Sequence, residues 1–276
     1  MEENMKFVFS EMHKKGNFFI LPTAWDVASA LLYEKAGFKA IGTTSWGIAA
    51  SSGYSDGEVL TFQEMFSMVK PIIKSVSIPV TVDIESGYSE NIEDILQNVE
   101  IIANAGAVGI NIEDSIKKGK INSNSLHFIE QQCDIIKSIK KMLMEKKQNL
   151  FINARTDGFI SNCNDPLAES IKRGNAYITA GADCIFVPGM KNIKDIEIFS
   201  GKINAPINIM ASQNLPDNIK LKSLGVTRLS LGSAAWKASM GHLNLMVNSI
   251  SNNGNISLLF DLPTPELNLK NIRKNI

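Results

Sequence analysis

The stretch Val80-Thr81-Val82-Asp83-Ile84-Glu85 begins as a buried strand and ends in two carboxylates. Successive side chains of a strand point to opposite faces, so Val82 and Ile84 are expected to face a layer of helices. Asp83 and Glu85 are then expected to face the other side. In a parallel β-barrel that other side is the interior, and the end of the strand is the mouth.

A second stretch, Gly109-Ile110-Asn111-Ile112-Glu113, repeats this pattern. The alternation places Asn111 and Glu113 inward and Ile110 and Ile112 outward. We therefore expect a third acid at the same rim.

Short apolar runs alternate along the chain with longer segments of helical periodicity, which is typical of repeated βα units. Strands are predicted at residues 18–21, 40–44, 80–84, 109–113, 150–155, 184–187, 207–210 and 228–231. Helices are predicted at residues 27–36, 62–75, 91–105, 128–145 and 166–180, among others. The sequence thus predicts an α/β fold, a (β/α)8 TIM-type barrel, in a single domain spanning residues 1–276. The tail at residues 258–276 is expected to leave the barrel and to pack on a neighbouring subunit.

The charge balance excludes some classes of partner. Lys plus Arg number 28, and so do Asp plus Glu, so no overall field attracts nucleic acid or an anionic membrane. The expected partners are small molecules and other copies of the chain. The three cysteines are widely spaced and no apolar run reaches membrane-spanning length, which favours a reducing cytoplasm.

The strand-end acids predict a metal site, because the active site of such a barrel lies at the C-terminal ends of its strands. Asp83, Glu85 and Glu113 provide only oxygen donors, and such a set selects Mg²⁺, or Mn²⁺, over zinc. The alternative is that these acids cap the helices that follow them.

The stretch Asn153-Ala154-Arg155-Thr156-Asp157 is expected to send Asn153, Arg155 and Asp157 inward. A buried guanidinium requires an anionic partner. A substrate carboxylate or phosphoryl group is favoured, because arginine suits bidentate recognition of such groups. The alternative is a structural network with the acids of the mouth.

Small and hydroxylated residues follow the second strand. The backbone N–H groups of Thr44, Ser45, Trp46 and Gly47 could form a nest for an anion. The turn-rich loop after them is expected to bring Asp56 to the mouth, although a solvated loop acid is the alternative.

Residues 115–125 read SIKKGKINSNS and directly follow the fourth predicted strand. This polar segment resembles a mobile lid, in which Lys117, Lys118 and Lys120 could close over an anionic substrate. The alternative is an ordinary solvated surface.

Five motifs carry a resemblance to a known superfamily. They are LPTAWD at residues 21–26, GYSDG at 53–57, VDIESGY at 82–88, NIED at 111–114 and NARTD at 153–157. In this combination they resemble the isocitrate lyase and phosphoenolpyruvate mutase superfamily over residues 16–245. The resemblance implies a modified barrel with Mg²⁺ near Asp83, helped by Asp56, Glu85 and Glu113 largely through water. It also makes Asp56 a candidate catalytic residue.

The resemblance implies roles for other residues as well. Residues 44–47 would bind the carboxylate of a 2-oxo acid, and Arg155, with Asn153 beside it, would contact the departing or transferring group. Lys120 and Asn122 match a Lys and an Asn on the lid of phosphoenolpyruvate mutase, which makes Lys120 a candidate catalytic residue and Asn122 a candidate substrate ligand. The superfamily commonly exchanges its last barrel helix between subunits and forms dimers that pair into tetramers.

Two departures from the superfamily pattern bear on the activity. Isocitrate and methylisocitrate lyases carry a Lys-Lys-Cys-Gly-His type lid motif, whereas residues 117–120 read KKGK and contain no cysteine. Phosphoenolpyruvate mutase has Asp-Ala-Asp where this chain has Asp83-Ile84-Glu85.

These observations predict a Mg²⁺-dependent lyase that acts on a small 2-oxo carboxylate, by C–C cleavage or decarboxylation through a pyruvate enolate. Phosphonate chemistry, as in a phosphoenolpyruvate mutase or a phosphonopyruvate hydrolase, is the nearest alternative. A barrel that binds an oxo acid without turning it over is an alternative of another class.

Overall fold

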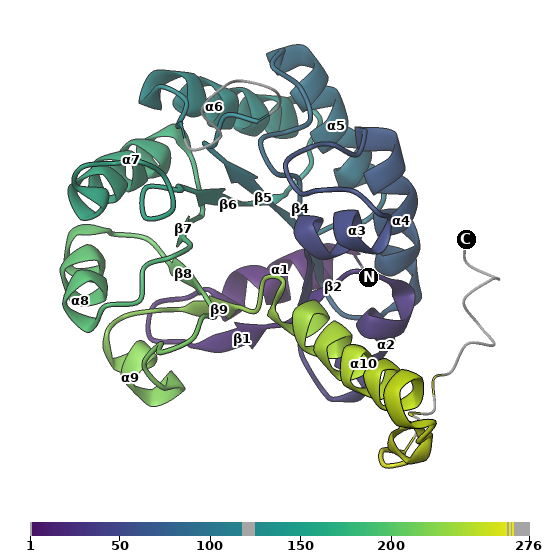
Figure 1. Ribbon diagram of the computed structural model, residues 1–276. Helices are drawn as coiled ribbons and strands as arrows, with labels where there is room; N and C mark the ends of the chain where they lie inside the picture. Colours follow the sequence, from purple (N-terminus) through teal and green to yellow (C-terminus); the bar gives the residue numbers. More distant parts are fainter. Residues whose placement is uncertain (1, 118–124, 264, 266, 268–276) are drawn as a thin grey trace.

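The computed structural model describes residues 2–117, 125–263, 265 and 267, and Figure 1 shows its strands arranged as a ring surrounded by helices. The strands are β1 Phe19–Leu21, β2 Thr23–Ala24, β3 Ile41–Thr43, β4 Val80–Asp83, β5 Gly109–Glu113, β6 Phe151–Arg155, β7 Cys184–Val187, β8 Ile207–Met210 and β9 Arg228–Ser230. All pairings among them are parallel, in the order β1-β9-β8-β7-β6-β5-β4-β3-β2. The predicted (β/α)8 barrel is confirmed.

The first predicted strand, residues 18–21, corresponds to β1, and a proline separates it from a second short strand, β2. Pro22 has no N–H to donate to a ladder. At this residue the chain passes from β1, which pairs with β9, to β2, which pairs with β3. The carbonyl groups at this point still accept hydrogen bonds from both neighbouring segments. The carbonyl oxygen of Leu21 accepts from the N–H of Leu231, and that of Pro22 accepts from the N–H of Gly42. The two short strands thus close the ring.

The helices follow the periodicity of the sequence closely. They are α1 Glu2–Met12, α2 Val27–Lys35, α3 Ser45–Ser51, α4 Phe62–Ser75, α5 Ile92–Asn104, α6 Ile129–Glu145, α7 Pro166–Ala180, α8 Ile193–Lys202, α9 Asn218–Ser223 and α10 Ala234–Asn253, with a 3₁₀ turn η1 at Ser257–Leu259. α7 illustrates why the ends fall where they do. The Asp165 carboxylate accepts from the N–H of Ala168, Pro166 occupies the first turn, and Gly181 ends the helix with a φ of 111°.

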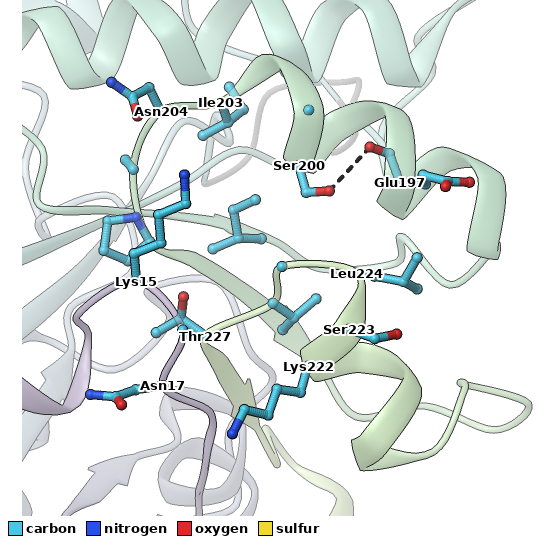
Figure 2. Close-up of a pocket in the computed structure, with 17 residues that line it drawn as sticks. Lys15, Asn17, Glu197, Ser200, Ile203, Asn204, Lys222, Ser223, Leu224 and Thr227 are labelled. Atoms are coloured by element: carbon cyan, nitrogen blue, oxygen red, sulfur yellow. Dashed lines mark hydrogen bonds between the residues drawn. The ribbon is translucent and has the colours of Figure 1, made fainter.

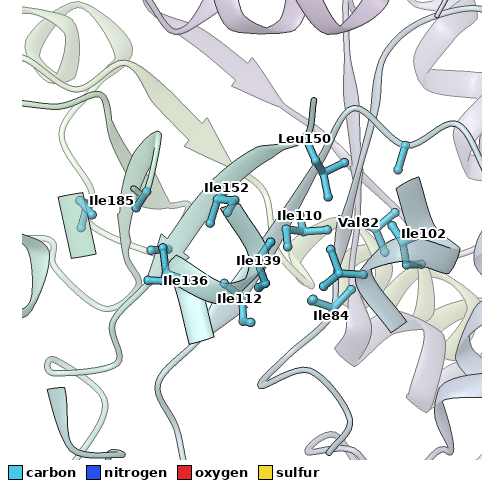
Figure 3. Packing of buried hydrophobic residues seen from close by; sticks show 14 of the residues in the cluster. Val82, Ile84, Ile102, Ile110, Ile112, Ile136, Ile139, Leu150, Ile152 and Ile185 are labelled. Carbon is cyan, nitrogen blue, oxygen red and sulfur yellow. The ribbon is translucent and has the colours of Figure 1, made fainter. Parts of the chain in front are cut away.

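The apolar side chains of β4 and β5, and of Ile84 just after β4, pack outward against the helices, as the alternation predicts. Val82 and Ile84 are fully buried, and so are Ile110 and Ile112 of β5. Figure 3 shows them in one cluster with isoleucines of α5 and α6. Because these side chains fix the orientation of β4 and β5, Asp83 and Glu113 are left at the mouth.

The N-terminal end of the barrel is closed by α1. Phe9 and His13 from this helix pack against Phe151 of β6, with ring centroids 5.3 Å and 4.2 Å from it. His13 is 1% exposed, and its Nδ1 lies 2.8 Å from the carbonyl oxygen of Phe9. Burial, followed by the charge of Arg228, lowers the pKa of His13 to about 3, so the imidazole is neutral inside this floor.

The last helix, α10, points away from the barrel in Figure 1. None of its residues is buried, and it exposes Leu243, Leu245, Val247 and Ile250 to solvent. Within the described part of the chain, neither α10 nor any other helix is long and apolar enough to cross a membrane.

Candidate active site

Asp83 ends β4 at the mouth of the barrel and is held by neighbouring residues of β3 and α3. The hydroxyl of Ser45 donates to Asp83 Oδ2 over 2.9 Å, and the N–H of Ser45 points to the same oxygen at 3.3 Å. The N–H of Asp83 donates to Thr43 Oγ1 at 2.9 Å. The segment predicted as an anion nest is therefore the first turn of α3, where Thr44 accepts from the N–H of Gly47, and its Ser45 already holds a protein carboxylate.

Glu85 lies beyond the end of β4, so strand alternation does not set its direction. Its backbone is in the left-handed region, with a φ of 48°, and the residue is 3% exposed. Its Oε1 accepts from the N–H of Glu58 at 3.1 Å and from the hydroxyl of Tyr88 at 3.2 Å. Its Oε2 lies 3.5 Å from Lys117 Nζ.

Glu58 is a buried residue of this site that the sequence analysis did not identify. Its Oε1 accepts from the N–H and hydroxyl of Ser86, at 3.0 Å and 2.7 Å, and from the N–H of Tyr88 at 2.8 Å. Glu58 and Glu85 thus each accept hydrogen bonds from the loop that carries the other. Glu58, Glu85 and Tyr88 all have positive φ, which concentrates backbone strain in this one pair of loops.

Glu113, at the end of β5, is paired with both nearby cations. Its Oε2 lies 2.7 Å from Arg155 Nη1, and its Oε1 contacts Lys117 Nζ. Burial favours the neutral amine of Lys117, but the carboxylates of Glu113 and Glu85 outweigh it and raise the pKa of this lysine.

Arg155 is held on its other side by Asp157. Two nitrogens of the guanidinium, Nε and Nη2, donate to Asp157 Oδ1 and Oδ2 at 2.6 Å and 2.9 Å. Asp157 also accepts from Ser115, and its N–H donates to Asp114 Oδ1 at 3.0 Å. The protein itself therefore supplies anionic partners for Arg155. This is the structural network that the sequence analysis gave as the alternative to a substrate anion.

Asp114 links this group to α7. It is fully buried, and its Oδ2 accepts from the hydroxyl of Tyr177 at 2.7 Å and lies 3.1 Å from Arg173 Nη1. The backbone of Asp157, and with it the fork on Arg155, is thereby attached to a helix of the outer layer.

Asn153 lies deeper in the barrel than Arg155. It is fully buried and donates to Asn111 Oδ1 at 2.8 Å. The same oxygen lies 3.3 Å from Nη2 of Arg228, a fully buried arginine that also donates to Ser230. The signal that could have identified Arg228 is a charged residue within a predicted strand.

Among the residues that the structure describes, carboxylates outnumber cations at this mouth. The carboxylates include Asp56, Asp83, Glu85 and Glu113, and the described cations that act on them are Lys117 and Arg155. Burial, followed by the charge of Asp56, raises the pKa of Glu85 to about 7. Desolvation, followed by the charge of Asp83, likewise raises the pKa of Asp56. Among the described residues, however, no group of three His, Cys, Asp or Glu side chains converges closely enough to hold a metal ion alone.

Lys118, Lys120 and Asn122, which the sequence analysis assigned to a lid, lie outside the described residues. Lys117 is the basic residue of that segment that the structure brings to the acids. A cavity of about 240 Å³ adjoins it, lined in part by Glu58, Tyr88 and His127.

A larger cavity, of about 510 Å³, lies at the opposite end of the barrel, where β8 and β9 begin (Figure 2). Its lining includes Lys15, Ile203 and Lys222 and none of the predicted site residues. Lys222 lies in the last turn of α9, where a cation compensates the helix carbonyl groups. This hollow is not part of the acidic site.

The family model for phosphoenolpyruvate phosphomutase matches residues 9–251. The chain belongs to this family. The resemblance inferred from the motifs is therefore confirmed. As a member of this family, the chain is a lyase or a phosphonomutase.

Individual members of the family show how far the similarity extends. An uncharacterized protein of Mycobacterium tuberculosis is 33% identical over 84% of this chain and 84% of its own length. The 2-methylisocitrate lyase of Halalkalibacterium halodurans is 29% identical over 72% of this chain and 65% of its own. A crystal structure from Burkholderia cenocepacia J2315, assigned provisionally as a phosphonomutase, aligns with a TM-score of 0.84 and 31% identity over 89% of this chain and 99% of its own.

Proposed function

We propose that this protein is a Mg²⁺-dependent lyase that breaks a bond next to the 2-oxo group of a small 2-oxo carboxylate. The observation that carries the proposal is the excess of carboxylates over cations among the described residues at the mouth of a phosphoenolpyruvate phosphomutase family barrel. An excess of this kind, with oxygen donors only, suits a hard divalent cation.

The pairing of the acids indicates which of them would hold Mg²⁺. Glu113 is engaged by Arg155 and Lys117, and Glu85 by Glu58, Tyr88 and Lys117, which leaves Asp83, with Asp56 near it, as the principal ligands. Since no triad of described residues converges, water would complete the coordination, and Glu85 and Glu113 would act through that water. Mn²⁺ would suit the same donors.

Bound Mg²⁺ would supply Lewis-acid stabilisation of the negative charge that bond cleavage leaves on a pyruvate enolate. The protein's own residues would set the geometry. Ser45 orients the Asp83 carboxylate, and the N–H and hydroxyl groups of residues 44–47 would donate to the substrate carboxylate. Arg155, held rigidly by Asp157 and Glu113, would face the departing group. Asp56 and Lys120 remain candidates for proton transfer, with Asn122 and Asn153 as candidate substrate ligands.

Metal binding can be tested separately from turnover. We expect Mn²⁺ titrated into the metal-free protein to give a bound signal in electron paramagnetic resonance, and Asp83→Asn to remove it. Glu113→Gln should keep most of that signal, since Glu113 would act through water. A bound signal that Asp83→Asn leaves intact would refute the assignment.

The reaction itself is tested with a panel of 2-oxo acids, in which pyruvate release is measured with and without Mg²⁺. Phosphonopyruvate followed by phosphorus NMR tests the alternative, P–C bond chemistry, which the provisional phosphonomutase assignment of the Burkholderia protein favours. Stabilisation by oxalate and Mg²⁺ with no turnover of any substrate would support a binding protein instead.

We further propose that the chain acts as a homo-oligomer, a dimer or a tetramer, with α10 exchanged between subunits and residues 258–276 on the neighbour. The support is the apolar surface that α10 exposes, including Leu243, Leu245 and Val247. Light scattering of the native chain should give a multiple of 30.3 kDa, and Leu245→Asp should shift it toward the monomer. A native monomer would contradict the proposal.

We also propose a cytoplasmic location, for which the unpaired Cys133, Cys163 and Cys184 are the support. Fractionation of the native cells with a marker enzyme of the cytoplasm tests it.

A further inference from the structure

The three tryptophans of the chain, Trp25, Trp46 and Trp236, lie around one glycine beside the acidic site. A Cβ added to Gly47 of α3 would lie 3.2 Å from Trp25 Cβ and 3.6 Å from Trp236 Cδ1. Trp46 is the neighbour of Gly47, and its ring centroid lies 5.1 Å from that of Trp236 in an edge-to-face arrangement. Two segments far apart in sequence, α3 and the start of α10, therefore meet at this point.

The start of α10 contacts both ends of α3. Trp236 Nε1 donates to Ser51 Oγ, at the end of α3, over 2.7 Å. The Lys237 ammonium group lies over the Trp46 ring, 4.4 Å from its centroid, in cation–π geometry. These contacts matter for α10, because none of its residues is buried and its first turn is where it touches this part of the barrel.

α3 is held on its inner side by the site. Ser45, the residue before Trp46, donates its hydroxyl to Asp83 Oδ2. The helix is seven residues long and cannot stabilise its own position by helix formation alone. Its placement, and with it the orientation of Asp83, therefore depends on its neighbours. These are the hydrophobic core around the buried Ile48 and Ala49 on one side and the first turn of α10 on the other.

We propose that Trp236 and Lys237 are positioning residues that hold Trp46 and, through Ser45 of α3, the Asp83 carboxylate. The contact between the first turn of α10 and α3 thereby sets the affinity of the site for its ligands. The consequence for ligand affinity rests on the proposed function; the mechanical coupling between α10 and α3 does not.

The coupling is tested first without ligand, by hydrogen–deuterium exchange of the amides of α3. We expect Trp236→Ala and Lys237→Met to speed exchange about five- to tenfold, the loss expected when one aromatic pair or one cation–π contact is removed. Trp236→Phe keeps a ring against Trp46 but loses the hydrogen bond to Ser51, so its exchange should lie between that of Trp236→Ala and that of the native chain. Asn248→Ala, an exposed position further along α10, is the matched control and should change nothing. Unchanged exchange in both Trp236→Ala and Lys237→Met would overturn the proposal.

The second measurement is oxalate binding in the presence of Mg²⁺, followed by intrinsic tryptophan fluorescence. The fluorescence of the native protein should respond to oxalate. Trp236→Ala and Lys237→Met should bind oxalate about five- to tenfold more weakly, and the affinity of Trp236→Phe should lie between those of Trp236→Ala and the native protein. If Trp236→Ala and Lys237→Met speed amide exchange in α3 but the native protein binds no oxalate, the positioning role is upheld and the proposed function is rejected. Equal oxalate affinity in all variants would overturn the positioning of Asp83, whatever the exchange data show.

Discussion

Arg155 and Asp157 form a fork in which two guanidinium nitrogens meet the two oxygens of one carboxylate, at 2.6 Å and 2.9 Å. The pair is two residues apart and lies where β6 ends. Its geometry is set before any substrate arrives, so the position of Arg155 belongs to the protein and not to the ligand.

Arg155→Lys should show what this fork contributes. Lysine cannot make two parallel hydrogen bonds, so we expect turnover to fall by about a hundredfold. Glu113 and Asp157 lose part of their pairing, and the free energy of unfolding should fall by up to about 3 kcal/mol. Steady-state kinetics and urea denaturation measure the two effects. Asp157→Asn keeps the size of the side chain but replaces one acceptor oxygen with an NH2 group, so the fork loses one hydrogen bond and one charge. Its turnover should lie between those of Arg155→Lys and the native chain. Native kinetics in Arg155→Lys would contradict a role for the fork.

Glu58 should be as necessary for the site as the predicted acids. Glu58→Ala removes the acceptor of three hydrogen bonds from Ser86 and Tyr88, so the free energy of unfolding should fall by about 2 kcal/mol. The loop carrying Glu85 loses its anchor, and turnover should fall with it. Glu64→Ala is the matched control, since Glu64 also accepts from a backbone N–H but lies on the surface at the start of α4. It should lower the free energy of unfolding less than Glu58→Ala does and leave turnover unchanged.

Tyr177→Phe separates stability from catalysis. The variant removes only the hydroxyl that donates to Asp114 and lies 3.1 Å from Arg173 Nη1. We expect a loss of about 1–2 kcal/mol in the free energy of unfolding, because Asp114 stays buried with one donor fewer. Turnover should change by less than about threefold if Arg173 still holds Asp114. Tyr54→Phe, at an exposed tyrosine, should have no measurable effect on unfolding. A hundredfold loss of turnover in Tyr177→Phe would show that Asp114 governs Arg155 more directly.

His13 should make the protein sensitive to acid. Its pKa is about 3 in the folded protein and about 6.5 when the chain is unfolded, so only the unfolded chain takes up the proton between these values. The stability that the neutral imidazole contributes is complete above pH 6.5 and is lost as the pH falls toward 3. The slope should be at most about 1.4 kcal/mol per pH unit. Urea denaturation at several pH values measures it. His13→Asn should flatten the dependence, whereas His242→Asn, at an exposed position, should not.

The layout of strands and helices was predictable because it depends on local periodicity. Residues 109–113, 184–187 and 207–210 are strands with the predicted bounds, and 62–75 and 166–180 are helices with theirs. The predicted ends at Asn91 and Ala105 are the two caps of α5. The strands β4 and β5 bring Asp83 and Glu113 to one rim for the same reason, since an alternating strand with one apolar face has a single way to face its helices.

The partners of the site residues were not predictable in this way. Strand alternation ends at Asp83, and Glu85 takes its direction from a left-handed turn whose conformation is fixed by Glu58, far away in sequence. The pairing of Lys117 with Glu113 depends on the path of a loop, for which the sequence carries no period. The hydroxylated run at Thr44 was too short to show helical periodicity, and so the helix α3 went unrecognised.

Pro22 separates two structural roles that one continuous strand would combine, sealing the base of the barrel and supporting the strand that leads to the acidic site. On one side of it, α1 and β1 seal the base of the barrel through Phe9, His13 and Leu21. On the other side, β2 borders the strand that leads into α3 and the acids. A chain cut at this proline would leave residues 2–21 joined to the rest by the β1–β9 ladder and by the packing of α1 on Phe151. These residues could therefore be supplied as a separate peptide while the acids at the other end of the barrel stay in place.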